Sequence, residues 1–214
     1  MDEQTWFACE DPHAMLDAVR SHRRLSDRRW RLFGTKCCDR LSHLNLARMS
    51  VSALRVSEHY ADGLAEVVEL NRAYAQAFDV ATEYQQLDGP PVAAGFAALA
   101  TCYAAHPDES ADDVAHYARR ALASETEASY QADLLRDIFG NPFRPVTIDA
   151  SWLTSDVLAL ARGIYDERAF DRMPILADAL QDAGCNNDDV LRHCRGGNAH
   201  VRGCWVVDSL LGKA

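Results

Sequence analysis

The C-terminal part of the chain gathers side chains that bind metals or act as nucleophiles. Five cysteine and histidine side chains lie within twenty residues: Cys185, His193, Cys194, His200 and Cys204. Zinc takes four such donors in a tetrahedron, so a structural zinc site is one hypothesis for this segment. The segment has no Cys-x2-Cys pair, however, and neighbouring side chains normally point apart. We therefore expect the alternative, in which the cysteines are buried among apolar side chains without convergence of their donor atoms.

A predicted helix from about His200 to Leu211 positions three polar side chains. His200, Cys204 and Asp208 recur every four residues, so they would stack on one side of this mostly apolar helix. A buried carboxylate needs a cation or donated hydrogen bonds. We therefore expect a buried polar network around Asp208. Its members are Asp208, His200, Arg202 and Arg195, with Arg144 and Arg168 as further candidate partners for the carboxylate.

An enzymatic alternative uses two of the same residues. His200 would lie one helical turn before Cys204 and could act as the base for a cysteine nucleophile. A buried apolar helix is a poor place for attack on a substrate, however. The sequence also has no glycine-rich phosphate loop, no nucleophile elbow and no His-Glu-x-x-His pair. An enzyme with a Cys/His site stays an alternative, and we lean toward no enzymatic activity.

Two further helices are expected between residues 170 and 197. Asp171 can accept hydrogen bonds from the start of the first, and Gly184 suits the left-handed position at which that helix ends. Cys185 follows the glycine and is expected to pack back on the last turn. Asn187 can cap the second helix, which a Gly-Gly pair ends.

The rest of the chain shows the periodicity of helices. Apolar residues recur at steps of three and four, and the only strand candidate is Pro-Val-Thr-Ile-Asp at 145–149. Pro142 and Pro145 exclude a continuous helix between them. We predict an all-α bundle of eight to eleven helices with an extended proline-containing linker near 140–152. The linker separates an N-terminal helical body, 1–139, from a C-terminal module, 140–214. Packing of the two parts as one domain is compatible with this prediction.

Bulk composition is that of a globular protein. The chain has 214 residues, of which 48% are hydrophobic and 25% charged. Its seven cysteines are odd in number and include the adjacent Cys37 and Cys38, which does not resemble a disulfide framework. The first residues are acidic and lack the apolar stretch of a secretory signal. We expect a reduced, cytoplasmic protein, and no apolar run is long enough for a bilayer span.

The charge is acidic overall but unevenly distributed. The net charge is −10, which argues against affinity for nucleic acid or anionic membranes. Residues 20–48 carry nine basic and two acidic side chains, so this segment is +7 and the remainder −17. An anion-binding patch would use Arg20, Arg23, Arg24, Arg28, Arg29 and Arg31. We expect instead that these arginines pair with carboxylates of this chain or point separately into water.

Several long segments resemble a family of proteins. Three are similar to a C-terminal block that recurs in planctomycete proteins of unknown function: RDIFGNPFRPVTID, YDERAFDRMPILADALQDAGC and HVRGCWVVDSLLGK. A fourth resembles the arginine-rich, double-cysteine stretch of that family near its N-terminus: RRWRLFGTKCCDRLSHL. The resemblance covers both ends of the chain. It implies no established activity and therefore assigns no functional residues.

The sequence favours an interaction role by elimination. We expect a helical protein-interaction or regulatory module that recognises another protein through a groove between its helices. Nucleic acid and membrane are not expected as partners. No cofactor is predicted, with zinc as the alternative.

Overall fold

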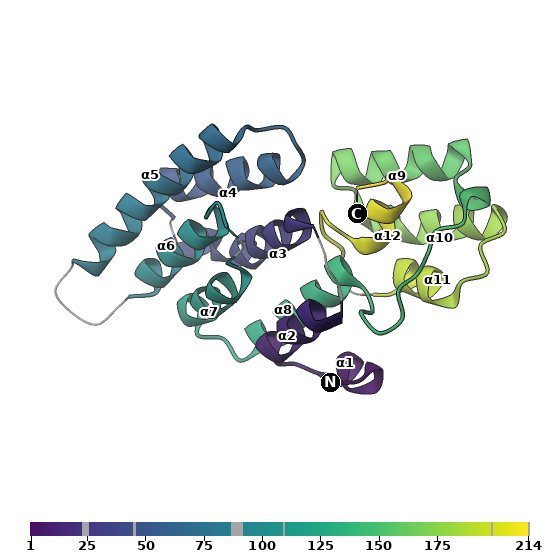
Figure 1. Cartoon of the computed structure of the whole chain (residues 1–214), viewed down its shortest axis with the longest axis horizontal. Coiled ribbons are helices and arrows are strands. Elements are labelled where there is room, and N and C mark those ends of the chain that lie inside the picture. Colours follow the sequence, from purple (N-terminus) through teal and green to yellow (C-terminus); the bar gives the residue numbers. More distant parts are fainter. Residues whose placement is uncertain (23–25, 45, 87–91, 109, 198, 214) are drawn as a thin grey trace. The chain divides into compact units, whose positions relative to one another are not determined.

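The computed structural model describes residues 1–22, 26–44, 46–86, 92–108, 110–197 and 199–213 (Figure 1). These residues form twelve α-helices, ten of them with seven or more residues, and no β-strand. The predicted all-α, multi-helix fold is confirmed. Two helices of six residues account for the difference from the predicted eight to eleven. No helix in the described parts of the chain combines the length and the apolar character that a membrane span requires.

The chain divides into two compact units, Met1–Leu135 and Arg136–Ala214. The boundary falls inside a helix, α8 (Thr126–Phe139), and not at the loop that follows it. Asp137 therefore belongs to the C-terminal unit although it lies before the predicted boundary at 139. This placement decides where the carboxylate of the candidate site comes from.

The N-terminal unit is a set of helices packed around small side chains. Its elements are α1 (Glu3–Ala8), α2 (Pro12–His22), α3 (Asp27–Asp39), a 3-10 turn η1 (Arg40–Leu44), α4 (Arg48–Ala61), α5 (Val67–Gln85), α6 (Ala93–Ala104), α7 (Ala111–Leu122) and most of α8. Helix α6 is rich in alanine and packs against α3, α4, α5 and α7. Small side chains on all sides permit such close approach, as expected for a buried helix.

The C-terminal unit has shorter helices and one apolar core. After the last turn of α8 come η2 (Ala150–Trp152), α9 (Ser155–Glu167), η3 (Phe170–Arg172), α10 (Met173–Asp182), α11 (Asp188–Arg195) and α12 (Trp205–Leu210). Residues 140–149 form no helix, in agreement with the two prolines, and they form no strand either. Cys185 and Cys194 are buried in the core of this unit with the apolar side chains of α9, α10 and α12.

Two of the helix signals in this unit operate as predicted. Gly184 has a φ of +87° and ends α10. Its N–H donates to the backbone carbonyl of Gln181, and the N–H of Cys185 donates to the backbone carbonyl of Leu180. This pair of bonds is a Schellman motif, and it turns Cys185 back onto the helix. Asn187 caps α11 by accepting from two backbone N–H groups of the first turn.

Two other predicted helix starts are wrong. Asp171 does not cap α10, because it lies within the 3-10 turn η3 and α10 begins only at Met173. The last helix begins at Trp205 and not near His200. Gly203 has a φ of +101° and forms a turn in which the N–H of Cys204 donates to Val201, a conformation that interrupts a helix.

Candidate metal centre

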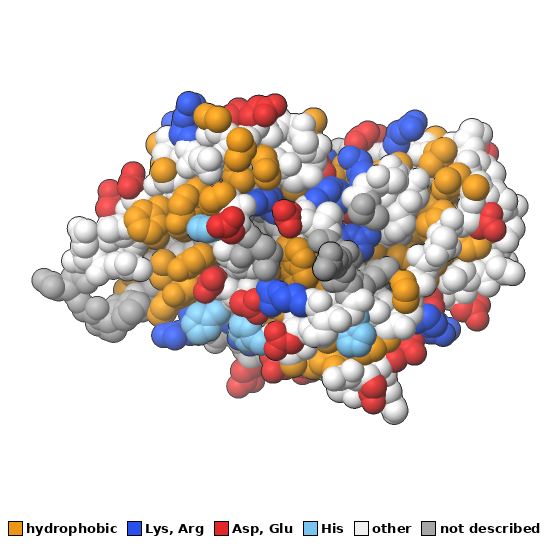
Figure 2. All heavy atoms as spheres, in the orientation of Figure 1, with side chains coloured by type: hydrophobic (Ala, Val, Ile, Leu, Met, Phe, Trp, Pro, Cys, Tyr) orange, Lys and Arg blue, Asp and Glu red, His pale blue; other side chains and the backbone are white. Residues whose placement is uncertain are grey.

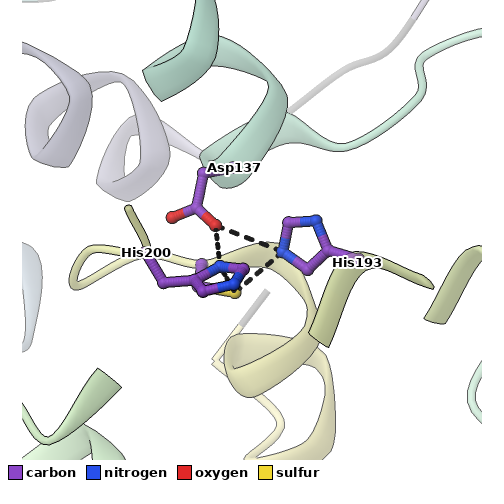
Figure 3. Close-up of side chains that lie close together, drawn as sticks. Asp137, His193 and His200 are labelled. Carbon is purple, nitrogen blue, oxygen red and sulfur yellow. Dashed lines mark hydrogen bonds and ion pairs between the residues drawn. The ribbon is translucent and has the colours of Figure 1, made fainter. Parts of the chain in front are cut away.

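Four side chains of the C-terminal unit converge on one point (Figure 3). They are Asp137, His193, His200 and Cys204, named here the metal-ligand cluster. Each offers one ligand atom, and these four atoms all lie within 4.8 Å of one another. The side chains are well shielded: His193 is 17% exposed, His200 5% and Asp137 4%. Cys204 is 1% exposed.

Each donor comes from a position that local structure fixes. Asp137 lies in the last turn of α8, and His193 lies in the last turn of α11. His200 precedes the turn at Gly203, and Cys204 is the residue before the first turn of α12. The turn brings these last two together, with Nδ1 of His200 3.9 Å from Sγ of Cys204. Three helix ends and one turn therefore meet at the cluster.

The four donor atoms lie close enough together to surround one ion. Oδ1 of Asp137 lies 2.6 Å from Nδ1 of His200 and 3.1 Å from Nε2 of His193. The same Nε2 lies 3.2 Å from Sγ of Cys204. Zinc bonds of about 2.0–2.3 Å at tetrahedral angles place nitrogen and oxygen roughly 3.3 Å apart and nitrogen and sulfur roughly 3.6 Å apart. The two nitrogen–sulfur separations, 3.2 and 3.9 Å, lie on either side of the tetrahedral value, and both nitrogen–oxygen separations are shorter than theirs.

The choice of nitrogen atoms distinguishes a metal centre from a catalytic triad. In a triad, one imidazole nitrogen faces the nucleophile and the other faces the orienting carboxylate. Here Nε2 of His193 contacts both Asp137 and Cys204, and Nδ1 of His200 also contacts both. Both rings thus aim a single nitrogen at the space that the carboxylate and the thiol share. This convergence is typical of ligands around one ion.

A backbone contact orients the carboxylate. The N–H of Val201 donates to Oδ2 of Asp137 at 2.9 Å. This bond holds the oxygen that faces away from the histidines and leaves Oδ1 directed into the cluster. Contacts of this kind fix the geometry of metal ligands in proteins.

Burial and neighbouring charges change the acidity of two members. Burial opposes ionisation of Asp137, but the hydrogen bonds and charges of His193 and His200 outweigh it, so the pKa of this carboxyl lies below its usual value. Burial, followed by the charge of Asp137, raises the pKa of the Cys204 thiol well above its usual value. A buried thiol of raised pKa is a poor nucleophile, which disfavours the enzymatic alternative.

The structure brings together three of the five Cys/His residues singled out as metal ligands. His193, His200 and Cys204 converge, and the expectation that Cys204 would not converge is wrong. Cys185 and Cys194 are not among the converging donors and are buried in the apolar core, to which Cys204 also belongs. Cys194 points to the core because it lies one turn after the buried Val190, whereas its neighbour His193 points to the cluster.

Sequence reasoning missed Asp137, although a signal was present. It follows Leu134 by three residues and precedes Ile138, and both of these are buried. A carboxylate on the apolar face of a helix requires a donor or a cation, which was the argument applied to Asp208. Its distance along the chain from the cysteines and histidines concealed it.

The network expected around Asp208 forms differently. Asp208 is fully buried, as predicted, and it has a partner within the fold. His200 pairs with Asp137, because the last helix begins only at Trp205 and does not include His200. The arginines lie as follows: Arg195 donates to Asp178 and Gln181, Arg144 donates to Asp189, and Arg202 lies over the ring of Tyr165. That an arginine neutralises Asp208 stays a prediction.

The arginines of the basic segment mostly contact groups of this chain. Arg20 pairs with Asp112, Arg28 pairs with Asp62, and Arg31 donates to the carbonyls of His106 and Pro107. Arg29 is buried. Arg23 and Arg24 lie outside the described residues.

Comparison with known proteins gives no relative. No protein-family model matches the chain, and the comparisons with curated proteins and with solved structures give no match either. The resemblance to planctomycete proteins stays a prediction. The function must therefore be inferred from the cluster itself.

Proposed function

We propose that the C-terminal unit is a zinc-binding module whose ion is held by Asp137, His193, His200 and Cys204. The observation that carries this proposal is the convergence of one nitrogen from each histidine on both the carboxylate and the thiol. Thiolate, imidazole and carboxylate donors together suit zinc. Four protein ligands complete a tetrahedron and leave no open position, so the role proposed for the ion is structural.

Two of the three helices that meet at the cluster are short, so an ion bound there would stabilise them. Helix α11 has eight residues and α12 has six. Helices of this length are marginal in isolation and depend on tertiary contacts. An ion bound at Asp137, His193 and Cys204 would cross-link the end of α8 to α11 and to the start of α12. Its binding free energy would then contribute to folding of the unit.

The test begins with protein purified without a histidine tag. We expect about one zinc per chain by atomic spectroscopy, as one tetrahedral site requires. Refolding with cobalt should give the visible bands of a tetrahedral ion and a thiolate charge-transfer band in the near ultraviolet. Cys204→Ser should abolish the charge-transfer band, and Asp137→Asn should weaken metal binding.

Cys194→Ala is the matched control for Cys204→Ser. Both thiols are buried in the same apolar core, and Cys194 adjoins a proposed ligand, but Cys194 is not among the four converging donors. This variant should keep the metal and both sets of bands. Wild-type protein that takes up neither zinc nor cobalt, or Cys204→Ser protein that keeps the charge-transfer band, would refute the proposal.

A protein-binding role is a second candidate, for the N-terminal unit. Several large apolar side chains on or just before α5 are exposed, namely Leu64, Val67, Val68 and Phe78. Figure 2 shows hydrophobic side chains gathered over this part of the unit. Exposed apolar patches often mark interaction sites. Val68→Asp with Phe78→Asp should preserve the helical content and abolish cross-linking to a partner in cells that produce the protein; unchanged cross-linking would exclude this surface.

A further inference from the structure

The ring of Trp205 contacts one proposed ligand and adjoins another. Its centroid lies 5.1 Å from that of His193, with the ring planes inclined at 51°. Trp205 also follows Cys204 directly in the chain and opens α12. The indole is partly buried and packs against the apolar core of the unit. A single side chain thus links the imidazole of α11 to the segment that supplies the thiol.

The same indole lies against the backbone that follows Asp137. Gly140 ends α8 with a φ of +68°, and its N–H donates to the carbonyl of Arg136. A Cβ atom at this position would lie 3.1 Å from Cγ of Trp205 and 3.3 Å from two further ring atoms. Both the left-handed backbone and this close approach require glycine. The indole therefore fills the space beside the helix end that carries the carboxylate.

His193 is the ligand that most needs such support. At 17% exposure its side chain is less buried than those of the other three cluster members. Asp137 is held by the N–H of Val201, and Cys204 is held by the turn at Gly203. The described residues give the His193 ring two aromatic neighbours, His200 and Trp205, and only the second lies outside the cluster. Packing against Trp205 thus restrains the ring from outside the cluster.

We infer that Trp205 is a positioning residue for the metal centre: its indole, accommodated by Gly140, holds the imidazole of His193 in the orientation that aims Nε2 at the ion. This inference rests on the proposed zinc site. Supporting groups around metal ligands typically change metal affinity 10–100-fold when they are removed. An aromatic ring of similar flatness should substitute for the indole, whereas an aliphatic side chain should not.

The experiment compares three full-length proteins with the wild type by cobalt titration followed by zinc competition. Trp205→Phe should retain the affinity within about threefold, and Trp205→Leu should bind zinc at least about ten times more weakly. The visible cobalt bands of Trp205→Leu should also shift, because a displaced imidazole distorts the tetrahedron. Val157→Ala is the control for general loss of packing. It removes buried volume from the same core but lies on α9, which carries no donor, so its cobalt bands should match the wild type.

The possible results separate this inference from the proposal on which it rests. Failure of the wild type to bind cobalt or zinc would overturn both. A wild type that binds, together with Trp205→Leu of unchanged affinity and spectrum, would overturn the positioning role alone. Equal spectral shifts in Trp205→Leu and Val157→Ala would overturn it too, because the effect would then be general loosening of the core. A shift of the cobalt bands in Trp205→Leu that is absent from Trp205→Phe would support the positioning role.

Discussion

Each unit of the molecule buries a cluster of ionisable side chains, and the two clusters are neutralised differently. In the N-terminal unit the ammonium of Lys36 lies 3.0 Å from Asp39 and 3.1 Å from Glu58. The cation there is part of the chain. In the C-terminal unit a carboxylate, two imidazoles and a thiol converge. These groups can take up positive charge from protons or from a metal ion.

The contrast shows what distinguishes a structural ion pair from a candidate metal centre. Burial alone does not, since Lys36 and Glu58 are both buried. The arrangement of the contacting atoms does. Around Lys36 the carboxylate oxygens lie against an ammonium that the sequence supplies, whereas in the metal-ligand cluster one nitrogen of each histidine lies against both the carboxylate and the thiol. The following predictions test this difference, from the largest expected effect to the smallest.

Removal of the metal should affect the C-terminal unit selectively. An ion present at about 1,000 times its dissociation constant stabilises the folded state by about 4 kcal/mol. Treatment with a strong chelator should therefore lower the unfolding free energy of this unit by about that amount or more. Hydrogen exchange of separate peptides can measure the effect: amides of α11 and α12 should lose protection while those of α3 and α4 keep it. Equal losses in both units, or none, would contradict the contrast.

Replacement of the built-in cation should affect the N-terminal unit selectively. Lys36→Met leaves Glu58 as a buried carboxylate without its ammonium partner and should cost about 3–5 kcal/mol. The cost should be the same with and without chelator. Asp39→Asn is the control, because that carboxylate is largely exposed and should contribute less than about 1 kcal/mol. Denaturant unfolding measures both, and a chelator-dependent effect of Lys36→Met would count against separate mechanisms.

Within the C-terminal unit, two buried carboxylates should behave differently. Asp208→Asn should cost about 1–3 kcal/mol, because the amide keeps part of the hydrogen bonding but not the charge. It should leave the zinc content unchanged. Asp137→Asn should instead reduce zinc affinity. Metal analysis of the two folded variants distinguishes them, and loss of zinc from Asp208→Asn would show that the site extends beyond the four donors.

A partly exposed ion pair should give the smallest effect, with a definite pH dependence. Burial disfavours ionisation of Asp112, but the hydrogen bonds and charges of Arg20 and His13 outweigh it and lower the pKa of Asp112. A lowered pKa stabilises the fold above the unfolded-state value near 3.8, and this contribution is lost as pH falls through the folded-state value. Asp112→Asn should cost about 0.2–1 kcal/mol at neutral pH. The urea midpoints of the wild type and of Asp112→Asn should be equal in strong acid. A larger difference in acid than at neutral pH would contradict this prediction.

Local signals in the sequence predicted the fold class and several element ends. The period of the apolar residues predicted the helices, Asn187 predicted the start of α11, and Gly184 predicted the end of α10. These succeed because caps and left-handed glycines act within a few residues. The last helix failed for a local reason as well. Gly203 lies within the predicted helix, but its backbone has a positive φ that interrupts a helix.

The candidate site was only partly predictable, because one donor is remote in sequence. The segment from His193 to Cys204 supplies three of the four proposed ligands, and its residue types suggested metal chemistry. Asp137 arrives from another helix, and no spacing rule connects residues across the intervening loop and helices. The assumed helical stack of His200 with Asp208 also assigned the histidine to the wrong carboxylate. Tertiary packing, which hydrophobic periodicity does not encode, determines which carboxylate reaches the cluster and which carboxylate pairs with His200.

The course of α8 across the unit boundary bears on how the C-terminal unit can be isolated. The proline-containing loop after α8 is an obvious place to divide the chain. A fragment that begins at Gly140, however, would lack Asp137, one of the four donors. A fragment that starts at Thr126 would retain α8 entire, with its last turn and Asp137. Limited proteolysis products that begin on either side of Asp137 should therefore differ in metal content. Cleavage in the loop that follows α8 would separate Asp137 from the other three donors, His193, His200 and Cys204.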